Sequence, residues 1–489
     1  GAFVISFGGV RRASGSVGFE RSTRTLTLAD GTTTASADVL SFGGDDLSLF
    51  VGAKAGDPDQ IGLSVENVDL AVALAFSNET SGGAAGAEWL LAQGSAASAG
   101  LVGVPGITAS VDTVVVEMAQ VLTEDGASAD PLMVDFGSGG TSIDVPTGTG
   151  TSQSLDLDSD RGEYIRAAGN FELGVGNFFY ADGSLGLELS AQTVNLSDSG
   201  STTVDTDAIL IGGTVNRAFA GLNGPYWNDP TDPMVTNPDA LGVTLENVDI
   251  GLAILNAREG EPALYNGLTW TALEADADNV ALVGVPGVTL SANTVNVAIN
   301  QVQGLGSSQD SSDFVVDFAH ADTDITVITG PSTDRTLTID GSRGEQVRVS
   351  GSFDLDVGGF FSVSGDMGVE QSTRTLQIAN GQQVETQVLA IGGDSINGFV
   401  GVNGGTANEI GFDLTGLDFG LLLASDDVDL DDDGTADDTL SWTALEAEAD
   451  SVGLVGFDVN LLEATVSNAL VEYNSVSGAG AAANDWVLD

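Results

Sequence analysis

Apolar and polar residues alternate along most of this chain, and the alternation predicts β-strands. Phe353, Leu355 and Val357 fall on one face of an extended segment, and the apolar residues of 361–369 keep the same parity. Dipeptides such as the Asn-Gly at 380–381 supply the positive backbone angles that tight hairpins require. The pattern predicts an all-β protein built from many strands joined by turns.

One segment is also compatible with a short helix. Residues 442–456 are rich in Ala and Glu, which favour helices. Leu445, Ala447 and Ala449 nevertheless follow the period of two. A strand is therefore the preferred interpretation of this segment.

Long segments of the sequence recur three times, at a period of about 170 to 180 residues. The matching segments are 1–28, 169–196 and 351–378; 41–52, 210–221 and 390–401; 64–74, 244–254 and 413–423; and the stretches that begin at Trp89, Trp270 and Trp442. We therefore divide the chain into copy one (1–168), copy two (169–350) and an incomplete copy three (351–489). The counterpart of residues 141–168 is missing from copy three, which predicts a cut from a longer array or a protomer completed by a neighbour.

A shorter sequence repeat of about twenty residues occurs within each copy. Repetition at this spacing is typical of a β-solenoid or a stacked β-meander. The main rival is a row of immunoglobulin-like sandwiches, each about 100 residues long and separated by linkers. The copies run together without a Pro- or Ser-rich break. We therefore expect one continuous elongated tandem-repeat array, and the sequence leaves solenoid and meander open.

Charge and composition exclude several functions. The chain has 71 acidic and 13 basic residues, for a net charge of -58, and such a surface repels nucleic acid and anionic lipid. It has no Cys and one histidine, His320, which leaves few groups for catalysis. No apolar run approaches the roughly 18 residues of a membrane span, so membrane insertion is not expected. We predict a protein that is not an enzyme, in a medium whose cations screen its charge.

The acidic loop 426–438, DDVDLDDDGTADD, is the sharpest candidate for a metal site. Its carboxylates occupy positions one, three, five and nine of a calcium loop, with Gly434 at the tight turn. The predicted ligands are Asp429, Asp431, Asp433 and Asp437. Position twelve is Leu440 instead of the glutamate of an EF-hand, and the matching loops of the other copies lack the motif. We expect one Ca²⁺ site that acts as a local clamp; the alternative is a solvated acidic hairpin tip.

Two further groups of residues have a structural and a functional interpretation. Arg161, Glu163 and Arg166 recur as Arg343, Glu345 and Arg348, which predicts an arginine-carboxylate clamp between neighbouring strands, with an acidic-sugar site as the alternative. The three recurring Trp residues are expected to anchor the core at strand ends. Tyr226 and Trp227 look exposed beside Pro225 and are the better candidate for a sugar-stacking platform.

Five phrases of the sequence resemble the long repeats of giant secreted adhesin-like or hemagglutinin-like surface proteins of aquatic Gram-negative bacteria. They are GLNGPYW (221–227), FFSVSG (360–365), LSWTALEAEA (440–449), LVGVPGVT (282–289) and VVDF (315–318). The resemblance implies an extracellular, repetitive surface or filament protein. Such arrays often carry a DxDxDG loop after GPYW, whereas this chain has NDPTDPMVTNPD at 228–239, so the resemblance brings no calcium site there.

Strand alternation, repetition and the resemblance together predict a structural role. We expect a subunit or segment of an extracellular bacterial filament, sheath or adhesin stalk, which self-associates into a homopolymer or tandem array through strand edges. The alternative is a calcium-dependent adhesin module that binds a glycan or a cell surface. A dedicated binding site should then occupy a loop of one copy alone, as the motif at 429–437 does.

Overall fold

The computed structural model describes most of the chain. The described residues are 1–7, 11–80, 84–122, 132–136, 141–158, 161–198, 202–227, 235–306, 313–428, 438–457, 462, 464–478 and 486–489. Nearly all regular secondary structure in this part of the chain is β-strand, which confirms the predicted all-β class. The segment 442–456 lies almost entirely in a strand, as the alternation of its apolar residues indicates.

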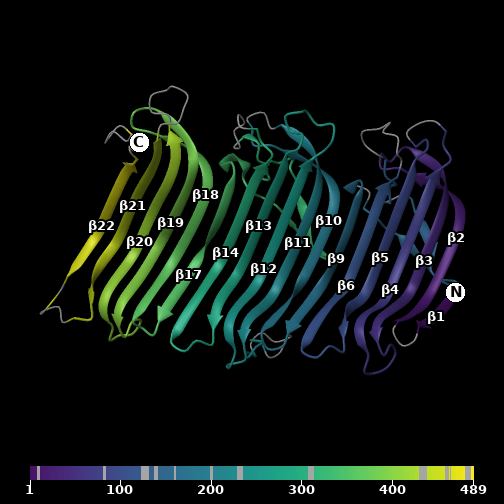
Figure 1. Ribbon diagram of the computed structural model, residues 1–489, viewed down its shortest axis with the longest axis horizontal. Coiled ribbons are helices and arrows are strands. Elements are labelled where there is room, and N and C mark those ends of the chain that lie inside the picture. Colours follow the sequence, from purple (N-terminus) through teal and green to yellow (C-terminus); the bar gives the residue numbers. More distant parts are fainter. Residues whose placement is uncertain are drawn as a thin grey trace.

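Among the described residues, eighteen strands form one open antiparallel sheet. In chain order they are β1 (Ala2–Phe7), β2 (Arg11–Thr27), β3 (Thr34–Ala53), β4 (Ile61–Ser77), β5 (Glu88–Val102), β6 (Ile107–Val121), β9 (Tyr164–Val175), β10 (Phe179–Asn195), β11 (Thr203–Leu222), β12 (Leu241–Ala257), β13 (Thr269–Val283), β14 (Val288–Gln303), β17 (Gln346–Val357), β18 (Phe361–Gln377), β19 (Gln383–Val402), β20 (Ile410–Val428), β21 (Asp438–Val455) and β22 (Thr465–Ser477). Each strand pairs with the next strand of this series, which is the topology of a meander. The sheet is long and twisted, with β1 and β22 at its opposite edges (Figure 1).

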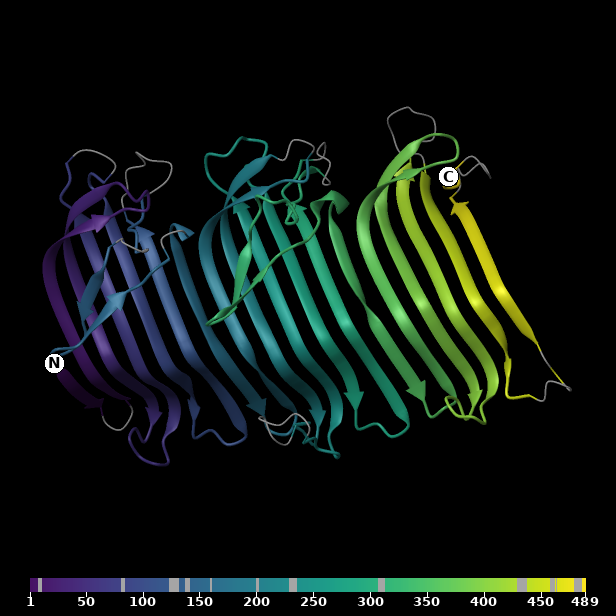
Figure 2. The same cartoon turned by 180° about the vertical axis from the view of Figure 1, so that it is seen from behind.

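Two short hairpins lie across one face of this sheet. The first is β7 (Ile143–Pro146) with β8 (Ser152–Leu155), and the second is β15 (Thr326–Gly330) with β16 (Thr333–Thr336), followed by a 3-10 turn, η3 (Gly341–Arg343). The first hairpin crosses strands β2 to β5, and the second crosses β9 to β12 (Figure 2). Figure 2 shows no described segment lying in the same way across β18 to β21.

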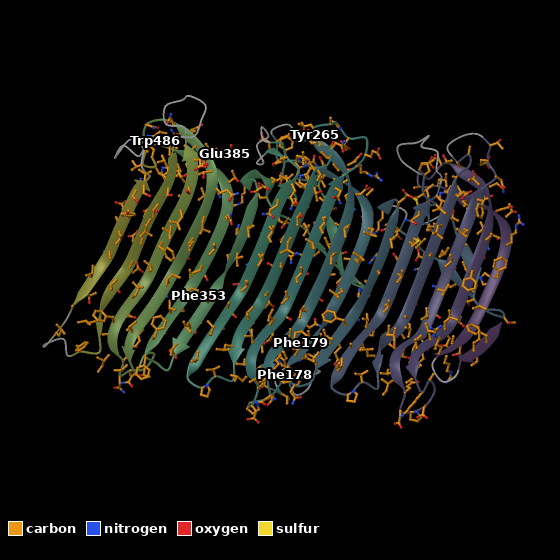
Figure 3. The ribbon with its side chains drawn as sticks, in the orientation of Figure 1. Phe178, Phe179, Tyr265, Phe353, Glu385 and Trp486 are labelled. Carbon is orange, nitrogen blue, oxygen red and sulfur yellow. The ribbon has the colours of Figure 1, made fainter. Side chains whose placement is uncertain are left out.

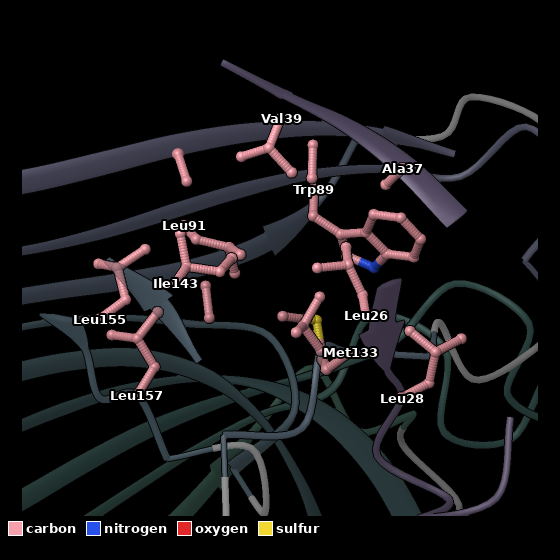
Figure 4. Packing of buried hydrophobic residues seen from close by; sticks show 14 of the residues in the cluster. Leu26, Leu28, Ala37, Val39, Trp89, Leu91, Met133, Ile143, Leu155 and Leu157 are labelled. Atoms are coloured by element: carbon pink, nitrogen blue, oxygen red, sulfur yellow. The ribbon is translucent and has the colours of Figure 1, made fainter. Parts of the chain in front are cut away.

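The hydrophobic cores lie between the sheet and the segments that cover it. Trp89 is fully buried among Leu91, Ile143 and Leu155, so the first core joins β5 to the β7–β8 hairpin (Figure 4). Trp270 holds the matching place in a second core beneath β15 and β16. The third core, around Trp442, contains fewer buried residues. The expectation that these three Trp side chains anchor the core is confirmed, because each is at most 1% exposed.

Each buried Trp also ties a later segment to the sheet. The indole Nε1 donates to the carbonyl oxygen of Leu132, Phe314 or Trp486, at 3.0, 2.6 and 2.8 Å respectively. A buried indole N–H needs such an acceptor, because leaving it unpaired costs free energy. Tyr265 packs against the second core and Trp486 belongs to the third, and both lie at one end of the strands, whereas Phe178 and Phe179 lie at the other end (Figure 3). A smaller core of Phe219, Trp227 and Ala240 lies near Phe179, which pairs with Ala220.

The strands run without a break across the boundaries at 168/169 and 350/351. β9 and β17 each span one of these boundaries. β6 pairs with β9 so that Val111 lies opposite Phe171, and β14 pairs with β17 so that Ala292 lies opposite Phe353. Neighbouring parts of the chain therefore meet through continuous backbone hydrogen bonding.

Candidate binding face on strands β18 to β21

Glycines form the floor on which the β15–β16 hairpin lies. The carbonyl oxygen of Ile328 would stand 2.3 Å from a Cβ atom at Gly186 of β10 and 2.3 Å from one at Gly212 of β11. Real Cβ atoms do not approach a carbonyl this closely, so only glycine allows the hairpin backbone to reach the sheet. Val327 of β15 and Leu337, which follows β16, are completely buried in the second core.

The β7–β8 hairpin meets the sheet in the same manner. A Cβ atom at Gly18 of β2 would lie 2.2 Å from the carbonyl oxygen of Pro146, and one at Gly43 of β3 would lie 2.6 Å from it. Gly18 aligns with Gly186, and Gly43 aligns with Gly212, in the recurring segments. A glycine pair therefore marks the place where a hairpin crosses.

The same glycine pair recurs on β18 and β19, where it is open. Gly368 aligns with Gly186, and a Cβ atom there would have Ser350 Cβ at 3.7 Å as its nearest neighbour. Gly392 aligns with Gly212, and its nearest neighbour would be the carbonyl oxygen of Phe419 at 3.7 Å. Both glycines line a groove of about 1010 Å³ that extends over β18 to β21 and is also lined by Arg348 of β17 and by Glu472, Tyr473 and Asn474 of β22. We call it the open groove.

Apolar residues of the open groove are less buried than their counterparts under a hairpin. Ala444 and Leu422 line the groove and are partly exposed, whereas the aligned Ala272 and Ala253 are completely buried. The side chains are small or aliphatic in both places, so the difference comes from the segment that covers Ala272 and Ala253. The open groove thus offers an apolar floor with nothing described above it.

A charged cluster fastens the β15–β16 hairpin to the sheet. The guanidinium of Arg335 donates to Glu274 at 3.0 Å and to the backbone oxygen of Asp249 at 3.2 Å, and it also pairs with Asp276. The Arg335 side chain is only 11% exposed. Burial alone would lower the pKa of the guanidinium, but the hydrogen bonds to Asp276 and Glu274 outweigh burial and raise this pKa.

The acidic half of that cluster recurs in the open groove. Asp418, Glu446 and Glu448 align with Asp249, Glu274 and Asp276, and all three line the groove. Asp418 accepts a hydrogen bond from the backbone N–H of Ser395 at 2.7 Å. Arg348 of β17 also lines the groove, but within the described ranges no arginine or lysine forms an ion pair with these three carboxylates, so no base takes the place that Arg335 holds in the counterpart.

At the first hairpin the arginine and two of the three acids are replaced by neutral residues, and the third acid is kept as Asp69, which aligns with Asp249. Gln153 of β8 aligns with Arg335, and the sheet positions aligned with Glu274 and Asp276 are Gln93 and Ser95. The aligned set under β7–β8 therefore has one acid and no arginine, whereas the set under β15–β16 has three acids paired with Arg335. Sequence reasoning missed this pairing, although comparing the copies position by position would have exposed it.

Most of the recurring Arg and Glu residues make the contacts of the predicted clamp, whereas Arg348 lines the open groove and forms no ion pair among the described residues. Arg161 contacts Glu188 of β10 at 2.9 Å, and the Nη1 atom of Arg343 lies 3.6 Å from the aligned Glu370 of β18. Glu163 accepts a hydrogen bond from the backbone N–H of Val121 at 2.7 Å. Glu345 accepts from Val302 at 3.1 Å in the same way. These contacts support the structural interpretation of the motif.

The prediction that Tyr226 and Trp227 form an exposed platform for stacking a sugar is wrong for Trp227. Trp227 is buried, with 4% of its surface exposed, because it packs against Phe219 and Ala240. The guanidinium of Arg217 lies 5.6 Å from its ring centre and covers that side. The indole is therefore a core residue and offers no free face for a sugar ring.

The predicted calcium ligands lie outside the described residues. Asp429, Asp431, Asp433 and Asp437 fall in the connection between β20 and β21. Elsewhere, in the ranges that the structure describes, no group of three or more His, Asp or Glu residues is arranged to hold a metal ion. The calcium site stays a prediction from the sequence.

In comparisons with known proteins, no family model, no curated protein and no solved structure matches this chain. Among the described residues, the search for a helix of sufficient length and hydrophobicity to traverse a bilayer finds none.

Proposed function

We propose that this chain is a structural subunit or segment of an extracellular filament, sheath or adhesin stalk, built from three tandem copies of which the third is incomplete. The copies in this view join edge to edge into one elongated sheet, and further copies join through β1 and β22. Nothing in this role calls for catalysis.

One observation carries the proposal, namely that the same strand pairing occurs at both boundaries between copies. In β6–β9 and β14–β17 the ladder continues from one copy into the next, and Phe171 or Phe353 lies opposite Val111 or Ala292. Continuous pairing of this kind adds copies without a linker and without limit. An open edge is also a template for a further strand.

The two outer edges are complementary to each other. β22 aligns with β6 and β14, and β1 aligns with the second half of β9 and β17. On that alignment Val466 takes the place of Ala292, and Phe3 takes the place of Phe353. Both edges are exposed, with Val466 at 59% and Val4 at 68%. A further junction would therefore place Val466 opposite Phe3 of the next copy.

Charge supports an extracellular, cation-rich setting. A net charge of -58 on an extended sheet is self-repulsive, and salt or divalent cations reduce the repulsion between neighbouring copies. The absence of Cys from the sequence removes any need for a reducing compartment. The resemblance to adhesin-like repeats leads to the same location.

Cysteine cross-linking tests the predicted junction, because the natural sequence has no Cys. The double variant Phe3→Cys with Val466→Cys should form a ladder of disulfide-linked dimers, trimers and longer chains on a non-reducing gel. Opposed residues of an antiparallel pair bring their Cα atoms to about 4.5–5.5 Å, within the range of a disulfide.

The matched control moves one cysteine out of register. Phe3→Cys with Thr465→Cys places the two thiols on opposite faces of the sheet, so we expect little ladder. Equal ladders from both variants would reveal random collision. A stable monomer in light scattering at physiological salt, with no ladder from either variant, would rule out assembly through these edges.

A further inference from the structure

We infer that the open groove on β18 to β21 binds an arginine-bearing β-hairpin supplied by a separate polypeptide segment. This inference concerns a face of the sheet and stands apart from pairing at the edges. It rests on the glycine floor, the apolar side chains and the acidic cluster of the groove, each compared with the aligned residues that hold β15–β16.

The glycine floor defines the shape of the ligand. Gly186 and Gly212 admit a hairpin carbonyl to within 2.3 Å of where a Cβ atom would stand. Gly368 and Gly392 leave the same space empty of described atoms, with nearest neighbours at 3.7 Å. Any side chain at these positions would close that space. A backbone segment crossing the strands is the ligand that uses it.

Charge selects the kind of hairpin. In the open groove Asp418, Glu446 and Glu448 repeat all three acids that surround Arg335, whereas the aligned set under β7–β8 keeps one acid, Asp69, beside the neutral Gln93 and Ser95. Covering three carboxylates with a neutral hairpin would bury charge without a partner, which is costly. The groove therefore favours a hairpin with an arginine at the position of Arg335.

This chain's own hairpins are not the occupant. Val327 and Leu337 of the β15–β16 hairpin are completely buried in the second core, and Ile143 and Leu155 of β7–β8 are almost completely buried in the first. Moving either hairpin to the groove would expose those side chains and open its core. The occupant is therefore a different segment with the same chemistry.

A peptide with the sequence of residues 323–341 is the probe, because it contains β15, β16 and Arg335. Fluorescently labelled peptide is titrated with the full chain at physiological salt, and anisotropy is measured. We expect saturable binding. A peptide carrying Arg335→Gln, the residue of the first hairpin, should bind at least about tenfold more weakly, since it loses its hydrogen bonds to the charged carboxylates of the groove.

Three protein variants locate the binding. Gly392→Ala puts a methyl group where the hairpin carbonyl should lie, and it should abolish binding while leaving the melting temperature unchanged. Gly398→Ala, in the same strand but outside the groove, meets only ordinary contacts at 3.6 Å or more and should bind the peptide as the unmodified chain does. The double variant Glu446→Gln with Glu448→Gln should bind the Arg335 peptide more weakly. The difference in affinity between the Arg335 peptide and the Gln peptide should also become smaller.

Several results would overturn the inference. The first is that no saturable binding is seen up to about 1 mM peptide, a range that spans weak interactions. The second is that the Gly392→Ala variant binds the peptide as tightly as the unmodified chain. The third is that the Arg and Gln peptides bind with equal affinity. Self-association of the chain that Gly392→Ala abolishes and the peptide does not compete with would identify a second copy as the occupant instead. Cross-linking through Phe3 and Val466 tests the edges, so either proposal can fail alone.

Discussion

Arg335 donates to Glu274 at 3.0 Å although the two residues are 61 positions apart in the sequence. This contact joins a hairpin lying across the sheet to a strand beneath it. Asp276 and Asp249 complete the acidic side of the pair. The hairpin is thus held by glycine-mediated backbone contact, by buried apolar side chains and by one arginine.

Replacing that arginine should destabilise the fold. Arg335→Gln leaves Glu274, which is only 20% exposed, without a base, and we expect a loss of about 1–3 kcal/mol in the free energy of unfolding. Urea unfolding followed by tryptophan fluorescence measures it. Arg258→Gln is the control, because the Arg258–Asp207 pair is exposed at 38% and 67% and should contribute less than about 1 kcal/mol. Equal losses from the two variants would contradict a special role for Arg335.

Stability should depend on the protonation of Glu370. Burial pushes the pKa of this carboxyl up, but hydrogen bonds from Arg374 and Ser372 outweigh burial and hold the pKa below its usual value of 4.5. The folded state therefore binds its proton less readily than the unfolded state. The resulting stabilisation is complete above the ordinary pKa of glutamate and is lost as pH falls through the lower folded-state pKa.

The difference between the unmodified chain and Glu370→Gln isolates this carboxyl from the other acids. Urea midpoints are compared from about pH 3 to pH 7, the range in which carboxylates titrate. The advantage of the unmodified chain should shrink as the solution becomes more acidic. A difference that stays constant or grows on acidification would mean that the Glu370 pKa is not lowered.

The buried Trp residues should be the most costly single positions in the cores. Trp270→Ala removes a completely buried indole and should reduce stability by about 3–5 kcal/mol. Trp270→Phe keeps most of the apolar volume but leaves the carbonyl oxygen of Phe314 without its donor, so about 1–3 kcal/mol should be lost. Calorimetric unfolding separates these values. An alanine variant as stable as the phenylalanine variant would show that packing around the indole contributes little.

Local patterns predicted the all-β class and the burial of the three recurring Trp residues. They did not show which alternating apolar positions lie in a core, since Val357, Met367 and Val369 are 36–40% exposed. They did not distinguish a solenoid from a meander, because both produce a period of two and differ only in which strands pair. The exposure of Trp227 was misjudged for a related reason. Its burial comes from Phe219 and Ala240, which are brought to it by long-range strand pairing.

The hairpin contacts could also have been predicted in part. The segment 141–168 was recognised as lacking a counterpart in copy three, but its place across the sheet face was not. Gly186 and Gly212 were a signal, since paired glycines inside strands often mark a close backbone approach. The joint change from Gln153 and Gln93 to Arg335 and Glu274 was a second signal. Neither signal reveals the angle at which a hairpin crosses, because that depends on the twist of the whole sheet.

Calcium should bind the loop 426–438 and stabilise the fold locally. The motif supplies four carboxylates, and a bound ion would offset their mutual repulsion. At a calcium concentration of about 100 times Kd, a single site adds about 2.7 kcal/mol to the free energy of unfolding.

Adding chelator should therefore lower the melting temperature modestly and make the loop more sensitive to protease, without unfolding the rest of the sheet. Asp431→Asn with Asp433→Asn should remove both effects, whereas Asp57→Asn in another exposed acidic turn should leave them unchanged. Calorimetric titration that detects no calcium binding, or protease cleavage of the loop that is the same with and without chelator, would leave this loop as a solvated acidic turn.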